Sequence, residues 1–250
     1  GHWVWVLDTA KVVDWNLDGS PRRMIGTHLD ITERKQAEDA LREQQSRLNY
    51  MAFHDSLTAL PNRALFYDRI NHSLARAKRS GNKLVLMLLD LDRFKYINDS
   101  LGHDAGDLLL KTLSGRLQDS VRDMDTVARL GGDEFVVLLK SLSNDKILAC
   151  NYASNVCDKI IKSMAQPVVV GDRRLHLGVS IGIVMFPIAD ESKDDLLRFA
   201  DTAMYKAKEA GKNTHKFFTH EMSIATHEII DMENDLLEAI NIHEYTIYKN

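Results

Sequence analysis

The stretch that decides the fold runs from Arg129 to Leu139 and reads R-L-G-G-D-E-F-V-V-L-L. Gly131 and Gly132 suit a two-residue hairpin turn, because glycine tolerates the positive φ that such a turn requires. Two carboxylates, Asp133 and Glu134, follow the turn, and an apolar run with the length and β-branched content of a buried strand comes next. The sequence therefore predicts that these acids lie at one end of a rigid hairpin.

A second predicted strand also ends in acids. Residues 83–92 read K-L-V-L-M-L-L-D-L-D, an apolar run whose carboxylates, Asp90 and Asp92, come only at its end. Glycines let a phosphate approach the backbone, and acids beside a phosphate make sense when a cation lies between them. Mg²⁺ takes few protein carboxylates, so Asp90 and Asp133 are about the expected number of ligands. The pattern indicates a nucleotide and metal site, although an ordinary surface turn also accounts for G-G-D-E taken alone.

Six motifs in order carry a resemblance to a known family. They are D-S-L-T-A-L-P-N-R (55–63), D-L-D-R-F-K-Y-I-N-D (90–99), L-G-H-D-A-G-D (101–107), G-G-D-E-F (131–135), S-I-G-I (180–183) and A-D-T-A-M-Y-K-A-K-E-A-G-K-N (200–213). Together they resemble the GGDEF diguanylate cyclases over residues 55–219. One position departs from the family pattern, Ala59 where glycine is usual, and it bears on turn geometry rather than on chemistry.

Helical and strand patterns alternate through the same region. Amphipathic helices are predicted over residues 64–79, 107–121, 144–164 and 194–209, and a late hairpin over residues 167–170 and 175–185. Strands that are first separated by helices and then paired by tight turns favour an α+β fold, with a central, mostly antiparallel sheet flanked by helices. The resemblance implies the same GGDEF fold, which is like the palm of polymerases and adenylyl cyclases.

The resemblance also implies the roles of the site residues. Mg²⁺, with Mn²⁺ as a substitute, is expected to be held by Asp90, Asp133 and the Leu91 carbonyl. Asp133 is expected to accept the proton of the attacking hydroxyl, and Glu134 to be either a second ligand or a structural acid. The residues expected at the phosphates are Phe94, Lys95, Gly131, Gly132 and the pair Lys208 and Lys212, one helical turn apart. The residues expected to read guanine are Asn98, His103 and Asp107.

The implied activity is that of a diguanylate cyclase, a nucleotidyltransferase that condenses two GTP into cyclic di-GMP and two pyrophosphates. One subunit holds one GTP, so a homodimer is expected to bring two together. Arg122 and Asp125 form an R-x-x-D at the family's position for inhibition by the product. Two alternatives remain: a GTP- or cyclic di-GMP-binding regulatory domain without turnover, controlling an adjacent EAL phosphodiesterase, and a purely structural dimerisation module.

The flanking regions indicate further domains. Residues 1–30, with strand patterns at 3–7 and 11–15, resemble the C-terminal remnant of a PAS sensor domain, and a plain β-hairpin cap is the alternative. Residues 31–54 predict a signalling helix with an a/d seam of Ala37, Leu41, Gln44, Leu48 and Met51. The seam favours a parallel coiled coil, and a lone helix packed on its own domain is the alternative. Residues 220–250 resemble a connecting helix and the first strand of a truncated EAL domain.

The composition excludes other classes. A net charge of -4 provides no field for nucleic acid, so a polynucleotide partner is not expected. No apolar run approaches the ~18 residues that span a bilayer, so no membrane segment is expected in this part of the protein. Cys150 and Cys157 lack a metal-ligand spacing and are expected to be buried thiols of a reducing compartment. These features predict a cytoplasmic domain, with membrane attachment through other regions left open.

Overall fold

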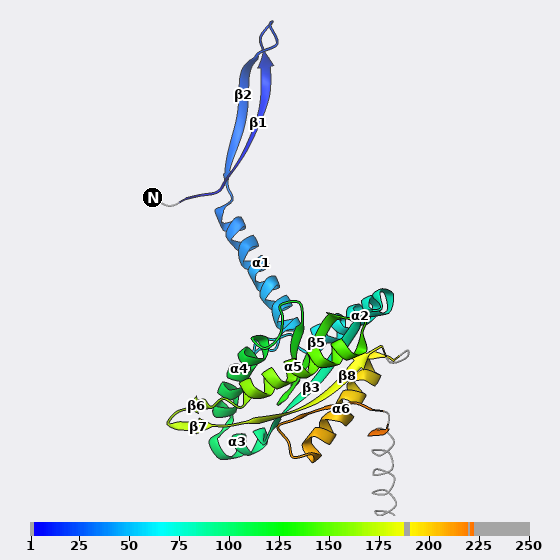
Figure 1. Cartoon of the computed structure of the whole chain (residues 1–250). Helices are drawn as coiled ribbons and strands as arrows, with labels where there is room; N and C mark the ends of the chain where they lie inside the picture. The colour runs from blue at the N-terminus through cyan, green and yellow to red at the C-terminus, as the bar shows by residue number, and fades with distance from the viewer. Residues whose placement is uncertain (1–2, 188–190, 220, 223–250) are drawn as a thin grey trace, which may run out of the picture. The chain divides into compact units, whose positions relative to one another are not determined.

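A computed structural model describes residues 3–187, 191–219 and 221–222 of the chain. The chain divides into two compact units, residues 1–52 and 53–250 (Figure 1). The connecting helix and EAL strand predicted within residues 220–250 lie outside the described residues, apart from Glu221 and Met222. None of the described helices is both long and apolar enough to cross a membrane.

The first unit is an antiparallel hairpin followed by a helix. β1 (Val6–Trp15) pairs with β2 (Pro21–Asp30), and α1 (Thr32–Phe53) follows directly. The prediction of two separate strands at residues 3–7 and 11–15 was wrong, because residues 8–10 continue the pairing with residues 26–28 and do not turn. The helix predicted after residue 31 is confirmed.

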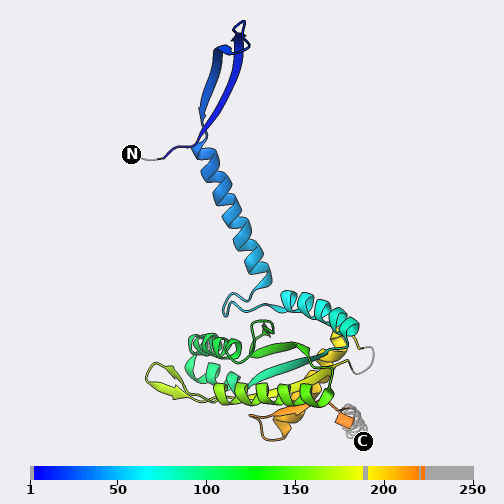
Figure 2. The ribbon, with the colours of Figure 1, turned by 45° about the horizontal axis from the view of Figure 1, so that its top comes forward.

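The second unit is built on a five-stranded sheet in the order β4-β5-β3-β8-β9 (Figure 2). β3 lies at its centre, between antiparallel neighbours β5 and β8, and β9 extends the sheet in parallel with β8. The strands of this sheet are β3 (Lys83–Asp92), β4 (Thr126–Gly131), β5 (Glu134–Leu142), β8 (Gly178–Phe186) and β9 (His215–Phe217). The predicted α+β fold with a mostly antiparallel sheet is confirmed.

Helices cover both faces of this sheet. They are α2 (Arg63–Ser80), α3 (Phe94–Leu101), α4 (His103–Gln118), α5 (Lys146–Met164) and α6 (Lys193–Glu209). Leu84, Leu86 and Leu88 of β3 belong to one buried cluster with α2 and α6, whereas the alternate residues of β3 belong to a second cluster with α4 and α5. Because side chains alternate along a strand, Asp90 continues the α2 and α6 face beyond the end of its apolar cluster.

Two parts of the second unit differ from the predicted elements. Residues 94–101 form helix α3, which is not among the helices predicted above, and Arg93 adopts a left-handed conformation (φ 64°) that redirects the chain into it. The strand predicted over residues 175–185 is divided: β7 (Arg173–Leu175) pairs with β6 (Val168–Val170) in a separate small hairpin, and β8 starts again at Gly178 in the main sheet. The alternation of apolar residues continues through this break, so the sequence pattern does not reveal where one strand ends and the next begins.

Candidate active site

Two acidic residues lie opposite each other on the neighbouring strands β3 and β5. In the antiparallel pairing of β3 with β5, Asp90 lies directly opposite Glu134. Directly opposed residues of an antiparallel pair point to the same face, with Cβ atoms about 4.5–5.5 Å apart. The end of the apolar strand and the end of the hairpin turn therefore place Asp90 and Glu134 on the same face of neighbouring strands, and the sharing of a cation by Asp90 and Asp133 stays a prediction.

A lysine of α6 completes this cluster. Lys208 Nζ lies 2.8 Å from Asp90 Oδ1. The helix comes this close because of Gly182 in β8, where a Cβ atom would collide with the Ala200 carbonyl oxygen and the Met204 amide. A glycine in the strand thus sets the distance between helix and sheet, and that distance decides which residues Lys208 can reach.

The electrostatics of the cluster favour a cation. Burial raises the pKa of Asp90, the ion pair with Lys208 opposes this rise, and the charges of Asp133 and Asp92 add to it. Burial likewise raises the pKa of Glu134, and the charges of Asp90, Asp201 and Asp133 raise it further. Burial and neighbouring acids therefore disfavour the ionised forms of Asp90 and Glu134, and Lys208 partly offsets this effect at Asp90.

These residues fit a divalent cation of the magnesium type. Mg²⁺ prefers oxygen ligands, uses one or two carboxylates and leaves other positions to water and phosphate. Within the described residues no three histidine, cysteine or acidic side chains are gathered as a complete metal cage. Mg²⁺ bound to a phosphate substrate needs only such a smaller set, and Asp90, Asp133 and the Leu91 carbonyl remain the predicted ligands.

Hydrogen bonds from Arg129 hold the hairpin turn that carries Asp133. Gly131 and Gly132 have φ values of 151° and 51°, which non-glycine residues rarely adopt. The Arg129 guanidinium donates to the Gly132 carbonyl from Nε at 3.0 Å and from Nη2 at 2.8 Å, and to Asp55 Oδ1 from Nη1 at 2.9 Å. Asp55 and Arg129 therefore fix the turn, a role that the sequence analysis did not assign to them. Asp55 lies in the D-S-L-T motif and Arg129 in R-L-G-G, and these positions were the only sequence feature that could have pointed to this role.

Asp92 of β3 also fixes a neighbouring segment, in this case beside β8. It is 8% exposed, its Oδ1 accepts from Ser180 Oγ at 2.8 Å, and its Oδ2 accepts from the Asn213 amide at 2.9 Å. Asp92 thereby ties the segment after α6 to the central strand. The expectation that Lys212 lies one turn after Lys208 on one helical face was wrong: α6 ends at Glu209 and Lys212 is left-handed, with φ 65°. Lys212 is exposed on the tied segment instead.

The residues expected to read guanine lie on α3 and α4. Asn98 Oδ1 is buried and has no hydrogen-bond partner within the described residues. It points at Gly106, where a Cβ atom would collide with it. His103 and Asp107 are exposed on the first turns of α4. A buried amide oxygen without a partner, beside exposed polar side chains, suits a ligand with hydrogen-bond donors.

Lys95 and Phe94 begin α3 behind the left-handed Arg93. Lys95 is exposed, whereas Phe94 is buried. The first N–H groups of a helix have no acceptor within the helix, so they can donate to a phosphate. Lys95 and the backbone at Phe94 therefore suit the anionic part of a nucleotide, and their role in binding stays a prediction.

The R-x-x-D residues lie at the edge of the sheet. Asp125 is 8% exposed, and its two oxygens accept from the Arg122 amide at 3.2 Å and the Lys140 amide at 3.0 Å. The Arg122 guanidinium lies 4.2 Å from the centre of the Tyr152 ring. In this arrangement Asp125 shapes its own turn, and Arg122 stacks on an aromatic face.

Comparison with known proteins agrees with this geometry. Residues 52–214 match the family model described as diguanylate cyclase, GGDEF domain. The chain is 34% identical over 209 residues to the bifunctional diguanylate cyclase/cyclic di-GMP phosphodiesterase MucR of Pseudomonas aeruginosa, a match that covers 84% of the chain and 30% of MucR. It is 37% identical over 193 residues to the cyclic di-GMP phosphodiesterase NbdA of the same organism, covering 77% of the chain and 24% of NbdA.

A third relative also has a solved structure. Diguanylate cyclase TpbB of Pseudomonas aeruginosa is 40% identical over 189 residues, covering 75% of the chain and 42% of TpbB. The structure of its GGDEF domain superposes with a TM-score of 0.65 at 38% identity, over 70% of this chain and 99% of that one. The chain thus spans less than half the length of these three relatives. With the family model matched over most of its length, the chain belongs to the GGDEF domain family of diguanylate cyclases.

Proposed function

We propose that this chain is a diguanylate cyclase that condenses two GTP into cyclic di-GMP and two pyrophosphates at the interface of two GGDEF domains. The observation that carries the proposal is the direct pairing of Asp90 with Glu134, with Lys208 at 2.8 Å from Asp90. This arrangement places two carboxylates that fit a cation beside a lysine that suits a phosphate. The hairpin beside them is intact and held by Arg129.

Each half of the reaction forms one phosphodiester bond. The 3′-oxygen of one GTP attacks the α-phosphorus of the other, the bond from the α-phosphorus to the bridging oxygen breaks, and pyrophosphate leaves. Asp133 takes the proton of the 3′-hydroxyl, a contribution of roughly 10²–10⁴ in rate where general base catalysis operates. Asp90, the Leu91 carbonyl and Asp133 would hold Mg²⁺, which lowers the pKa of the hydroxyl and neutralises charge on the phosphates.

The remaining residues bind and orient GTP. Lys95, Lys208 and Lys212 balance the negative charge of the triphosphate, and the backbone of Phe94, Gly131 and Gly132 allows close approach. Asn98, His103 and Asp107 recognise guanine, since a carboxylate accepts from the N1–H and N2–H₂ edge that adenine lacks. A site built to pair with that edge rejects the analogue strongly, because the acceptor would be left unpaired.

Dimerisation follows from the reaction, because one domain holds one GTP. We assign the contact between two copies to α1, where Leu41 and Leu48 are 56% and 67% exposed. The same proposal includes two flanking regions: a PAS remnant at residues 1–30 and the entry into an EAL domain at residues 220–250. In that arrangement α1 carries a signal from the sensor into the cyclase.

The test measures cyclic di-GMP by mass spectrometry after incubation with GTP and Mg²⁺ over a range of protein concentrations. We expect a specific rate that rises with protein concentration and disappears in Asp133→Asn. Asp172→Asn, a matched change of an exposed acid in the turn between β6 and β7, should keep the wild-type rate.

A regulatory domain that binds without turnover is the second candidate, favoured by the similarity to NbdA, whose name is that of a phosphodiesterase. GTP binding by calorimetry, without product at any protein concentration, would establish it in place of the cyclase. Absence of any GTP-induced rise in melting temperature would instead leave the structural dimerisation module.

A further inference from the structure

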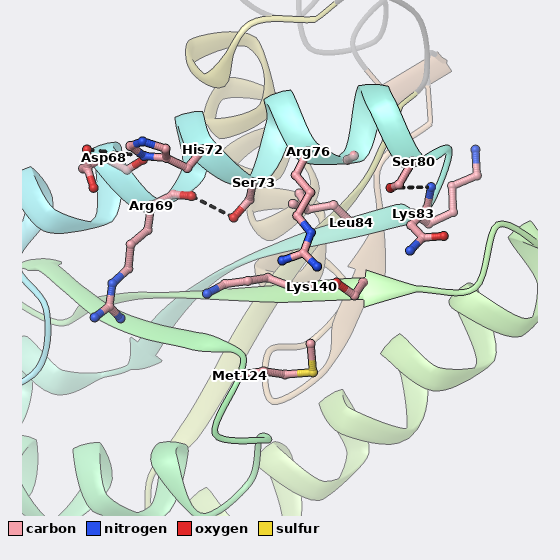
Figure 3. A pocket seen from close by; sticks show the side chains of 13 residues that line it. Asp68, Arg69, His72, Ser73, Arg76, Ser80, Lys83, Leu84, Met124 and Lys140 are labelled. Atoms are coloured by element: carbon pink, nitrogen blue, oxygen red, sulfur yellow. Dashed lines mark hydrogen bonds and ion pairs between the residues drawn. The ribbon is translucent and has the colours of Figure 1, made fainter.

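A cavity of about 410 Å³ lies between α2 and β5, where Figure 3 shows Arg76 of α2 and Lys140 of β5. A larger cavity, of about 610 Å³, lies beside β8 and β9, on the opposite edge of β3 from β5. Lys83, the first residue of β3, lines both, and Figure 3 shows its side chain extending away from Arg76 and Lys140. Asp90 lies seven residues further along β3, about 23 Å at about 3.3 Å per residue. The larger cavity is therefore separate from the proposed active site.

The wall of the larger cavity is mostly apolar. Its apolar residues come from the end of β8, from β9 and from the residues that follow these strands; they are Val184, Met185, Pro187, Phe217 and Phe218. They lie together because β9 runs parallel to β8 and pairs with it. All of them except Val184 are only partly buried. An apolar ligand in the cavity would remove their remaining surface from water, which the hydrophobic effect favours.

Two lysines complete this wall. Lys83 begins β3, and Lys146 is the first residue of α5. Within the described residues, neither ammonium group forms an ion pair or a hydrogen bond. Glu221 is the single acid among the described lining residues, so the lining has an excess of one positive charge. The first amides of α5 add nothing to this charge, because the Asp145 side chain already accepts from two of them. The lysine side chains are therefore the groups that an anion would meet.

We propose that the larger cavity binds a small amphipathic anion, with an apolar chain or ring against Phe217 and Phe218 and one carboxylate or sulfonate group at Lys83 and Lys146. Small-molecule sites usually have volumes of about 300–1,000 Å³ and mostly apolar walls, with a few charged groups that fix the orientation of the ligand. The apolar wall holds the body of the ligand, and the two lysines select a negative group over a positive one. The inference does not rest on the proposed function, because the ligand does not contact the cluster around Asp90.

Cys150 provides a reporter inside the larger cavity. It lies in the lining and is partly exposed, whereas Cys157, the other cysteine of the chain, is 0% exposed. Alkylation of the folded protein by N-ethylmaleimide should therefore occur at Cys150, and mass spectrometry of its peptides identifies the modified residue. A ligand in the cavity covers this thiol and slows the reaction.

The test measures the rate of this alkylation in the presence of decanoate. Decyltrimethylammonium serves as a cation of the same chain length, and acetate as the acidic group alone. We expect saturating decanoate to slow the reaction at least fivefold, and the other two compounds to slow it less than twofold. Lys83→Met and Lys146→Met should each raise the decanoate concentration for half-protection at least fivefold.

Lys162→Met is the matched control, because it removes an exposed cation of α5 that lies outside the cavity lining. It should change the decanoate concentration for half-protection less than twofold. Melting curves of each variant establish that it is folded.

Four outcomes would overturn the proposal. Alkylation of Cys150 as slow as that of Cys157 without ligand would mean that the cavity is closed in solution. Equal protection by decanoate and decyltrimethylammonium would remove the role of the lysines. Equal losses in Lys146→Met and Lys162→Met would show a general attraction to positive charge. Calorimetric binding of decanoate without protection of Cys150 would place the ligand elsewhere. Because none of these readouts uses cyclase activity, failure of the proposed function leaves this result unaffected.

Discussion

Arg129 joins Asp55 to the glycine turn: its guanidinium donates to Asp55 Oδ1 at 2.9 Å and to the Gly132 carbonyl at 2.8 Å. The two side chains are 11% and 23% exposed, so the ion pair is largely shielded from water. One arginine therefore connects the loop before α2 to the turn that presents Asp133. The position of that acid depends on a residue more than seventy positions away in sequence.

Arg129→Met is expected to destabilise the domain by about 1.5–3 kcal/mol at neutral pH, the range for hydrogen bonds to charged groups. Burial alone raises the pKa of Asp55, but hydrogen bonds from Thr58 and Arg129 lower it overall. Because the pKa of Asp55 is lower in the folded protein than in the unfolded chain, Asp55 contributes to folding stability above the unfolded value of 3.8. This contribution is lost as the pH falls through the folded pKa. Urea unfolding should thus show a difference between wild type and variant that shrinks in acid; a difference independent of pH would contradict the role of Asp55.

Glu134→Gln is expected to raise the melting temperature at neutral pH, since burial and neighbouring acids raise the pKa of Glu134. Because the pKa of Glu134 is higher in the folded protein than in the unfolded chain, its contribution to folding stability is fully present below the unfolded value of 4.5. That contribution is lost as the pH rises through the folded pKa. The gain should be at most about 2–4 °C, which about 1 kcal/mol gives in a domain of this size, and should vanish below pH 4.5.

Glu43→Gln, an exposed glutamate of α1, is the control for this prediction and should leave the melting temperature unchanged. Magnesium offers a second readout. If Glu134 lies beside the cation, Mg²⁺ should raise the melting temperature of wild type more than that of the variant. A lower melting temperature in Glu134→Gln at every pH would mean that Glu134 is held by favourable contacts instead.

Gly182→Ala is expected to destabilise the domain by about 1–3 kcal/mol, because its methyl group would meet the backbone of α6 at Ala200 and Met204. Displacement of α6 should also move Lys208 away from Asp90 and weaken GTP binding. Gly115→Ala is the matched control: no atom lies within 4 Å of its added Cβ, and alanine in a helix stabilises by about 0.5–1 kcal/mol. Opposite signs in thermal unfolding are the expected result, and equal effects would refute the packing argument.

Arg116→Met should loosen the contact between α4 and α5. The Arg116 guanidinium donates to the carbonyls of Ser163, Gln166 and Pro167, at 3.2, 2.6 and 3.0 Å, and so satisfies the C-terminal end of α5. The expected loss in urea unfolding is about 1–2 kcal/mol, since this site is partly exposed. Lys159→Met removes one bond, to the Asp119 carbonyl, and should cost less. GTP binding should be unchanged in both variants below their melting temperatures.

The sequence alone determined the elements whose signals are local. The glycine pair with its apolar run specified the β4–β5 hairpin, and the continuous apolar stretch of residues 83–92 specified a buried strand with acids at its end. The α+β class followed from the order of these patterns. The candidate acids Asp90, Asp133 and Glu134 were named on the same local grounds, because strand ends meet at one rim of a sheet.

Only the tertiary structure decided the relationships that depend on distant residues. The Arg129 link to Asp55, the tie from Asp92 to the Asn213 amide and the end of α6 before Lys212 leave no periodic trace in sequence. The cavity between α2 and β5 is of the same kind, since Arg76 and Lys140, separated by more than sixty positions in sequence, line it together. Periodicity reports which face of an element is buried, but not which residues of two elements come into contact.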